Sequence, residues 1–364
     1  MKVCFLGLGS MGSGVCRNLL NKGYALQVWN RSPEKAAKVA GWGAEAFATP
    51  QEATRGAGVV MSCLSSVAAL KAVAGGANGV FSCMGEGMAF YDMGTWDIES
   101  VLALDAEAER HGVRYVHMPM GKGPEAAEAG ESPLFFGGSK DVYERDKGFL
   151  SDIGEAFYLG DVKAACAFKL ITNLIGLSNN VILTEGVFLA KRMGLSEEAF
   201  LNGAKSTGAW SYQMRNSGHK VFAEAFLPMR GTLDNAWKDM KFGVEMAEKA
   251  GVSCPAFAML RDRYKAASEA GYGEEDYISV YRLLMDAEND ARRDNSPPGG
   301  VITPSKSLLH ICQQNYKNEG RGNFPPPCFY VLRRCLVNAG SQVAACSSCG
   351  LASGFSPLVS RATA

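Results

Sequence analysis

The stretch VCFLGLGSMGSG, residues 3–14, limits what this chain can fold into more than any other feature. An apolar run leads directly into Gly7, Gly9 and Gly12, and a helical pattern follows over residues 11–22. Glycines at this spacing permit a tight turn after a strand, a close backbone approach to a bound group and close packing of the next helix. We therefore expect a strand, a glycine turn and a helix that open a nucleotide-binding βαβ unit.

Short apolar runs alternate with helical patterns through the first third of the chain. Strands are expected near residues 2–8, 25–30, 58–64, 88–94 and 113–119, with a helix near residues 32–43. Strands interleaved with helices predict a parallel sheet that carries helices on both faces. The fold class expected for residues 1–163 is therefore α/β, a doubly wound Rossmann domain.

The pattern becomes helical from Ala164. Residues 164–192 contain no proline and predict one helix of roughly 28 residues, about 42 Å long. Further helical patterns occupy residues 196–204, 233–251 and 256–271. We expect residues 164–290 to form an all-α C-terminal domain, with the long helix as the spine that joins the two halves.

The composition changes again after residue 290. The final segment, residues 291–364, is rich in Pro, Gly and Ser and holds five of the 11 cysteines. Such a composition predicts a disordered tail with little packed structure. The spacings that flank Cys346 and Cys349 match no zinc module, so no metal site is expected.

Charge and hydropathy narrow the functional classes. The chain has 37 Lys and Arg against 37 Asp and Glu, so no general attraction to nucleic acid or to an anionic membrane is expected. No apolar run reaches the roughly 18 residues that span a bilayer, and the N-terminal run continues into a glycine turn as a first strand does. The six cysteines before residue 290 lie mostly in apolar context, as the buried thiols of a cytoplasmic protein do.

A dinucleotide cofactor is the expected ligand of the glycine turn. The N-terminus of the following helix directs its N–H groups and its dipole at a pyrophosphate. The residues assigned to this contact are Gly7, Leu8, Gly9, Ser10, Met11 and Gly12. The end of the second strand carries Asn30, Arg31 and Ser32, with no acid before Glu34. A guanidinium beside a hydroxyl suits a 2′-phosphate, which favours NADP(H) over NAD(H); a solvated loop arginine is the alternative.

These motifs resemble the β-hydroxyacid dehydrogenase family, from residue 1 to about 285. The resemblance rests on the glycine turn and its flanks, and on the segments YDMGTWDIES, KLITN and WKDM. It implies hydride transfer between a nicotinamide cofactor and a hydroxy acid or its aldehyde, an active site between the two domains, and a homodimer or homotetramer. It also implies that Thr95 lies beside the nicotinamide. Leu64 and Ser65 are assigned to the cofactor site as well.

The resemblance matches Lys169 and Asn173 to the catalytic helix of the family. They are four residues apart, so both lie on one helix face. Hydride transfer to an aldehyde leaves negative charge on oxygen, which an ammonium group neutralises or protonates, and partial desolvation lowers the pKa of that ammonium. From spacing alone, a snorkelling surface lysine is the alternative. Lys238 is expected to close over the cofactor or the substrate carboxylate, and Asp239 to brace the structure.

The resemblance also places a substrate loop at residues 117–138. Here Pro–Met–Gly–Lys–Gly stands in place of the Pro–Val–Ser–Gly–Gly that is usual in the family. The backbone N–H groups of Gly121 and Gly123 remain, and Lys122 favours a substrate with an additional anionic group, such as a second carboxylate or a sulfonate. A solvated lysine is the alternative. Trp210 is assigned to the substrate pocket, with a core position as the alternative.

A second departure lies ahead of the long helix, where Lys163 and Ala165 replace two glycines of the family pattern, so the entry into this helix is in question. The expected function is an NADP(H)-dependent semialdehyde reductase or 3-hydroxyacid dehydrogenase acting on a small anionic aldehyde or hydroxy acid. The alternatives are an NAD-dependent 3-hydroxyisobutyrate or sulfolactaldehyde-type dehydrogenase, and a non-catalytic scaffold relative. Lys169 argues against the scaffold and also against imine reduction.

Overall fold

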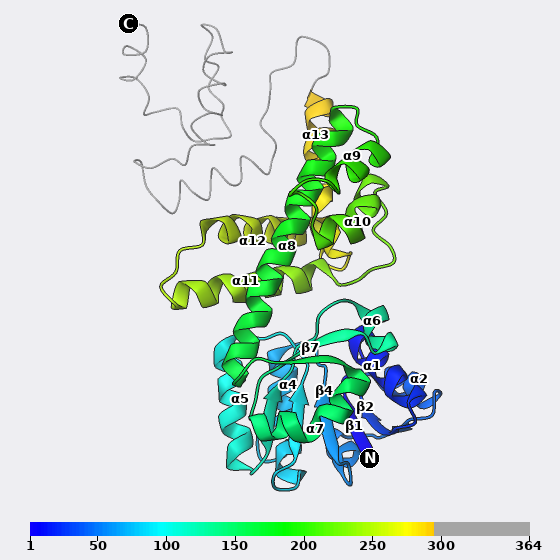
Figure 1. The fold of residues 1–364 in the computed structure, drawn as a ribbon, viewed down its shortest axis with the longest axis vertical. Coiled ribbons are helices and arrows are strands. Elements are labelled where there is room, and N and C mark those ends of the chain that lie inside the picture. Colours follow the sequence, from blue (N-terminus) through cyan, green and yellow to red (C-terminus); the bar gives the residue numbers. More distant parts are fainter. Residues whose placement is uncertain (295–364) are drawn as a thin grey trace, which may run out of the picture. The chain divides into compact units, whose positions relative to one another are not determined.

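The computed structural model describes residues 1–294 (Figure 1). Within it, Met1–Leu284 form one compact unit, and a second unit begins at Met285. The division of the chain at residues 163 and 290 stays a prediction. The tail prediction, including Cys346 and Cys349, falls on residues 291–364, of which all but the first four lie outside the described residues.

A six-stranded parallel sheet forms the centre of the N-terminal half. Its strands are β1 (Lys2–Leu6), β2 (Ala25–Trp29), β3 (Glu45–Ala46), β4 (Val59–Ser62), β5 (Ala89–Asp92) and β6 (Arg114–His117). They lie in the order β3-β2-β1-β4-β5-β6, and every neighbouring pair is parallel. The order reverses between β1 and β4, which is where ligands bind in open parallel sheets. The predicted Rossmann fold is confirmed.

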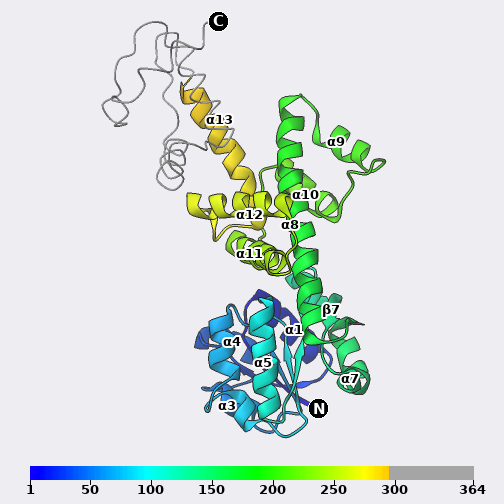
Figure 2. The same cartoon turned by 90° about the vertical axis from the view of Figure 1, so that its left-hand side faces the viewer.

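Seven helices follow or precede these strands. They are α1 (Ser10–Asn21), α2 (Pro33–Ala40), α3 (Pro50–Thr54), α4 (Val67–Ala74), α5 (Ile98–Arg110), α6 (Pro124–Ala129) and α7 (Lys140–Ile153), with a 3₁₀ turn at Val80–Cys83. Side chains alternate between two buried clusters along each strand: Val3 and Phe5 join one, Cys4 and Leu6 the other. The first cluster packs under α1 and α7, and the second under α4 and α5, on opposite faces of the sheet (Figure 2).

A second, two-stranded sheet follows β6. Strands β7 (Ser132–Phe136) and β8 (Gly154–Tyr158) pair in parallel. Two antiparallel bridges join this region to β6: His117, the last residue of β6, pairs with Gly137, and Met120 pairs with Leu134 of β7. The segment read from sequence as one substrate loop therefore contains α6 and β7. The short SPLFF run, with a proline inside it, carries a weak strand signal.

Helix α8 (Val162–Arg192) is 31 residues long and begins two residues before the predicted start. The Asp161 carboxylate caps it by accepting from the N–H of Ala164. Ala165 is buried, and it is Gly137 that allows the close approach, since a Cβ on Gly137 would lie 2.5 Å from the Cβ of Ala165. The loss of two glycines from the helix therefore leaves its entry intact.

The C-terminal half is helical. It contains α9 (Glu197–Ala204), α10 (Tyr212–Phe222), α11 (Leu233–Lys249), α12 (Pro255–Ala267), a π-helical turn (Ser268–Tyr272), a 3₁₀ turn (Tyr277–Tyr281) and α13 (Arg282–Asp294). Its core joins side chains of α8, α11 and α12 around Tyr264. The first turns of α8 belong instead to the sheet core, through Val162, Cys166 and Leu170. One helix therefore takes part in both cores.

Helix α8 is long and apolar enough, with a mean hydropathy of 1.3 over its best window, to meet the length and composition test for a membrane span. The sequence prediction had found no such run. In the structure, 39% of that window is buried inside the protein. Helix α8 packs against α10 and α11. We therefore describe α8 as the central helix of a folded unit.

Candidate functional site

The glycine turn has the geometry that its spacing predicts. Gly7 has a φ of +98°, and a Cβ there would overlap the carbonyl of Cys63. A Cβ on Gly12 would overlap the carbonyl of Gly7, so this glycine lets α1 pack tightly on the turn. The Cα of Gly9 faces open space. Gly9 is also the N-cap of α1 and supplies no side-chain cap, which leaves the first N–H groups of the helix for an anion.

Asn30 braces this turn. Its Oδ1 accepts from the N–H of Leu8 at 2.9 Å, and its Nδ2 donates to the carbonyl of Ser32 at 3.1 Å. Leu64 lies against the turn from the other side, because a Cβ on Gly7 would be 2.8 Å from its Cδ2. Ser65 is exposed, and Met11 packs against the sheet core. The assigned cofactor residues therefore meet at the carboxyl ends of β1, β2 and β4.

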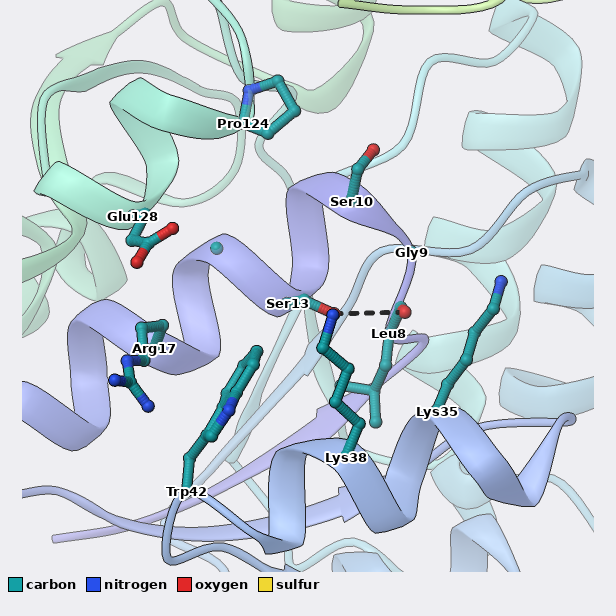
Figure 3. A pocket seen from close by; sticks show the side chains of 11 residues that line it. Leu8, Gly9, Ser10, Ser13, Arg17, Lys35, Lys38, Trp42, Pro124 and Glu128 are labelled. Carbon is teal, nitrogen blue, oxygen red and sulfur yellow. Dashed lines mark hydrogen bonds between the residues drawn. The ribbon is translucent and has the colours of Figure 1, made fainter. Parts of the chain in front are cut away.

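A cleft of about 510 Å³ opens beside the glycine turn (Figure 3). Its lining includes Gly9 and Ser10 from the turn and three cations, Arg17, Lys35 and Lys38. Both lysines extend from α2 toward the glycine turn (Figure 3). The sequence reading missed these cations, although a spacing of three residues on α2 places the two lysines on one helix face.

Arg31, the predicted 2′-phosphate contact, is exposed and does not line this cleft. Within residues 1–294 it makes no hydrogen bond or ion pair. Trp42 stands at the far end of the cleft, with the guanidinium of Arg17 5.1 Å and the ammonium of Lys38 5.7 Å from its ring centre. The lining of the cleft thus carries three cations and one carboxylate, that of Glu128.

Lys169 lies on α8 and is half-buried. Its Nζ donates to the carbonyl of Met120 at 2.7 Å, at the start of the loop that contains Gly121. Burial lowers the pKa of Lys169 below its ordinary value; Asp239 raises it, and Lys238 lowers it further. An ammonium group held in this way is a proton donor whose pKa is shifted toward neutrality.

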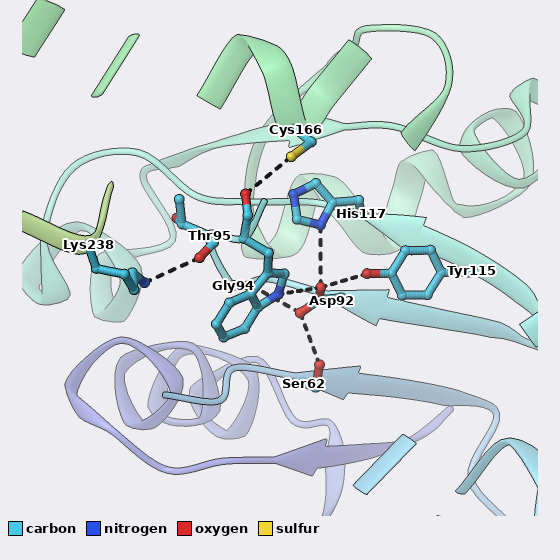
Figure 4. A network of polar contacts seen from close by, with 9 residues as sticks. Ser62, Asp92, Gly94, Thr95, Tyr115, His117, Cys166 and Lys238 are labelled. Carbon is cyan, nitrogen blue, oxygen red and sulfur yellow. Dashed lines mark hydrogen bonds and ion pairs between the residues drawn. The ribbon is translucent and has the colours of Figure 1, made fainter. Parts of the chain in front are cut away.

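Asn173 lies one turn further along α8. Its Nδ2 donates to Asp239 Oδ2 at 2.7 Å, while Lys238 Nζ pairs with Asp239 Oδ1 at 3.3 Å. Asp239 thus joins the predicted catalytic helix to α11, in line with the bracing role expected for it. The sequence had assigned Lys238 to the cofactor, and the structure brings its ammonium to 3.2 Å from the carbonyl of Thr95 (Figure 4).

A buried carboxyl group, that of Asp92, lies three residues before Thr95 in the chain. Asp92, fully buried at the end of β5, accepts hydrogen bonds from Ser62, Tyr115 and His117 (Figure 4), and also from the N–H of Gly94 and the indole of Trp96. The sequence reading singled out the segment that contains Asp92 but not this network. Its partners come from two other strands, β4 and β6, and from the loop after β5, so no local sequence pattern predicts it.

Lys122 lies in the predicted substrate loop, and its role there stays a prediction. This residue has a left-handed backbone, with φ of 62°, and its Nζ donates to the carbonyl of Glu131 at 2.9 Å. Lys122 is exposed. Gly121 packs closely against Pro133 of β7, and Gly123 is the N-cap of α6. In this structure the Lys122 ammonium therefore tethers the loop to the chain after α6.

Trp210 lies in the connection between α9 and α10 and is partly buried. Its backbone N–H donates to the carbonyl of Thr207, and the ammonium of Lys205 lies 5.9 Å from its ring centre. Both partners belong to its own segment. Within residues 1–294, no group of three or more His, Cys, Asp or Glu residues is arranged to hold a metal ion.

Two family models together match residues 2–284. The model described as the NAD binding domain of 6-phosphogluconate dehydrogenase matches residues 2–165, and the model described as NAD-binding of NADP-dependent 3-hydroxyisobutyrate dehydrogenase matches residues 164–284. Glyoxylate/succinic semialdehyde reductase 1 of Arabidopsis thaliana is 30% identical over 285 residues, which cover 78% of this chain and 98% of that protein. The chain belongs to the β-hydroxyacid dehydrogenase family.

Other relatives differ in what their names describe. Glyoxylate/succinic semialdehyde reductase 2, chloroplastic, of Arabidopsis thaliana is 29% identical over 290 residues, or 79% of this chain and 81% of that protein. Cytokine-like nuclear factor N-PAC of Anopheles gambiae is 30% identical over 282 residues, or 77% of this chain and 50% of that protein. The family thus contains both named reductases and a named nuclear factor.

Solved structures share the fold. Psf3 in complex with NADP+ and 2-OPP has a TM-score of 0.72 at 23% identity, covering 78% of this chain and 99% of that one. 3-Hydroxyisobutyrate dehydrogenase of Mycobacterium tuberculosis with L-serine has a TM-score of 0.69 at 21% identity, covering 78% and 98%. The chain matches both NAD-binding regions of a family whose named dehydrogenases and reductases act on hydroxy acids and semialdehydes.

Proposed function

We propose that this protein reduces a small carboxylated aldehyde to the corresponding hydroxy acid with NADPH, and oxidises the hydroxy acid in the reverse direction. The observation that carries the proposal is the half-buried Lys169 ammonium, held 2.7 Å from the carbonyl of Met120 beside the predicted substrate loop. The uncapped N-terminus of α1 at Gly9 and the cleft beside it fit the pyrophosphate of a dinucleotide.

The chain's own residues have three tasks in this reaction. A bound nicotinamide cofactor supplies the hydride. Lys169 donates its proton to the aldehyde oxygen as negative charge grows there, and its lowered pKa eases that donation. Asn173, held by Asp239, presents its amide beside Lys169 on the same helix face. In the oxidation direction Lys169, once neutral, takes the proton from the hydroxyl.

The substrate carboxylate is proposed to bind at the loop of Gly121 and Gly123. The N–H of Gly121 donates to the carbonyl of Pro133 at 2.9 Å, so the N–H of Gly123 is proposed to replace the missing Ser hydroxyl of the family pattern. Lys122 contributes a cation to the same loop. A substrate with a second anionic group would gain from this cation if it displaces the contact with Glu131. We therefore favour dianionic semialdehydes over monoanionic ones. Trp210 is proposed to border the pocket.

NADPH is the proposed cofactor. Arg31 and Ser32 follow β2 with no acid beside them, so no carboxylate repels a 2′-phosphate. Lys35 and Lys38 add two cations that face the glycine turn (Figure 3). Phosphate binding by several cations is favourable and weakens with salt.

A homo-oligomer is proposed from the exposed face of α8. Its apolar side chains Ile175, Ile182 and Leu189 are 50, 58 and 62% exposed, at seven-residue spacing along one face. A repeated apolar face of this kind on a long helix fits a second copy of the same helix. We also propose a cytoplasmic location, because Cys4, Cys16 and Cys166 are free and buried.

The test is a panel of aldehydes with NADPH and with NADH. Glyoxylate, succinic semialdehyde, tartronate semialdehyde, methylmalonate semialdehyde and sulfolactaldehyde cover one and two anionic groups. We expect turnover of at least one of them, with a higher kcat/KM with NADPH. If the protein binds NADPH but turns over none of these aldehydes, the non-catalytic scaffold alternative would be favoured. A relative named as a nuclear factor, N-PAC, shows that not every relative is named as an enzyme.

A further inference from the structure

The indole of Trp96 lies between the buried carboxyl group of Asp92 and the partly buried amine of Lys238. Its Nε1 donates to Asp92 Oδ2 at 2.7 Å, and the ammonium of Lys238 lies 5.2 Å from the indole ring centre. Trp96 itself is only 1% exposed, whereas the side chain of Lys238 is 28% exposed. The ring therefore separates the carboxylate inside the protein from the ammonium at the surface.

The carboxyl group of Asp92 is surrounded by polar contacts. Besides the indole it accepts from the hydroxyls of Ser62 (3.3 Å) and Tyr115 (2.7 Å), from the N–H of Gly94 (3.1 Å), and contacts His117 Nδ1 at 3.3 Å. These contacts engage both carboxyl oxygens. The bond from the Trp96 indole ends on Oδ2, the oxygen that also accepts from Tyr115.

Gly94 makes room for the indole. A Cβ at Gly94 would overlap the six-membered part of the Trp96 ring. The backbone of Gly94 has no positive φ, so it is the missing side chain and not backbone freedom that this position needs. We call Asp92, Gly94 and Trp96 the indole platform. The carbonyl of Trp96 also accepts from Cys166 Sγ at 3.3 Å, which ties the platform to α8.

We propose that the indole platform positions the Lys238 ammonium at the predicted nicotinamide side of the site. An indole N–H bonded to a carboxylate carries more electron density over its ring, and that density attracts a cation placed on the ring face. Lys238 is also held by the carbonyl of Thr95 and by Asp239. The platform adds to these two contacts a third one, on the face of the Trp96 ring. Asp92 and Trp96 are thus positioning residues that act through Lys238.

The first test needs no enzymatic activity. The rate at which a small acylating reagent modifies Lys238 is measured by mass spectrometry on the full chain at fixed pH, without cofactor. Trp96→Phe keeps a ring and removes the N–H, so the ring face holds the Lys238 side chain less firmly and leaves its nitrogen more accessible to the reagent. We expect the rate to rise about five-fold, the factor that corresponds to loss of a partly desolvated cation–π contact.

Tyr115→Phe is the matched control, since it removes another donor from the same carboxylate oxygen without touching the indole or Lys238. Its Lys238 modification rate should stay within two-fold of that of the unchanged protein. Gly94→Ala provides a second route, because its methyl group displaces the ring and should raise the rate as Trp96→Phe does. Unchanged rates in both platform variants, or an equal rise in the control, would overturn the proposal.

The second test rests on the proposed function and uses a double-mutant cycle. Trp96→Phe should lower kcat/KM with NADPH by about five-fold in the unchanged background and have almost no effect when Lys238→Met is also present. Equal effects in both backgrounds would show that Trp96 acts independently of Lys238, against the proposal. If no aldehyde is reduced, the proposed function fails, and the modification rates still decide whether the platform positions Lys238.

Discussion

Lys169 is the residue on which the proposed chemistry depends. Replacing it with Ala should lower kcat for aldehyde reduction by roughly 10²- to 10⁴-fold, because a positioned proton donor contributes about that factor. The Kd for NADPH should change little, since the glycine turn binds the cofactor. Lys163→Ala, an exposed lysine on the same helix, is the control and should retain activity. An unchanged kcat in Lys169→Ala would contradict the role assigned to this amine.

The pH dependence of reduction follows from the direction of the Lys169 pKa. The ammonium is the proton donor, so reduction should fall as pH rises through a midpoint below the ordinary value of 10.5, and oxidation should rise through the same midpoint. Asp239 raises this pKa, so Asp239→Asn should move the midpoint to lower pH. The measurement is log kcat against pH in both directions. A midpoint that moves upward in Asp239→Asn would contradict the electrostatic assignment.

Two residues allow the proposed preference for NADPH over NADH to be tested. Arg31→Asp should reduce the ratio of kcat/KM for NADPH to that for NADH by about ten-fold or more, since one charge-assisted contact becomes a repulsion. Lys38→Ala should also reduce it if the cleft at the glycine turn contributes. Equal ratios in the unchanged protein and in Arg31→Asp would show that the exposed arginine is only a solvated loop residue.

At the scale of elements, the entry into α8 sets where Lys169 points. Asp161 caps this helix through the N–H of Ala164. Asp161→Ala should cost about 1 kcal/mol and lower Tm by about 2–4 °C, whereas Asp161→Asn, which can still accept, should lose much less. Calorimetry on both variants measures the difference. An equal loss in the two would mean that charge at the helix start matters more than the cap.

The sequence predicted these elements unevenly, for physical reasons. Short continuous apolar runs and the glycine turn predicted the sheet, because a strand that is buried on both faces is apolar along its whole length. The sequence did not predict strand β7, whose five residues include Pro133, or helix α6, which lies in the predicted loop. The hydrogen bonds of Asp92 and the approach of Lys35 and Lys38 to the glycine turn were not predicted either. They depend on residues far apart in sequence, which only the packed sheet brings together.

At the scale of the whole molecule, cofactor binding should raise thermal stability. NADPH at about 100 times its Kd stabilises the folded protein by about 2.7 kcal/mol, because it binds only the native state. Thermal melts with NADPH, NADH and neither measure the effect. A larger shift with NADPH at equal concentration would support the proposed preference, and an identical shift with both would contradict it.

The proposed assembly can be tested on the same scale. The double change Ile175→Glu and Ile182→Glu places charges on the exposed face of α8 without altering a buried position, so the fold should persist while the oligomer dissociates. Light scattering after gel filtration gives the molar mass. Lys71→Glu, an exposed site on α4, is the control. A monomer before any change would remove the basis of this proposal.

Helix α8 has a further consequence. Because its early turns are part of the sheet core and its later turns part of the helical core, the amine of Lys169 is carried on a rod fixed at both ends. Substrate binding therefore does not have to order a loop to bring this amine into place. Little binding energy is then spent on assembling the machinery, and more of it remains available to tell one aldehyde from another.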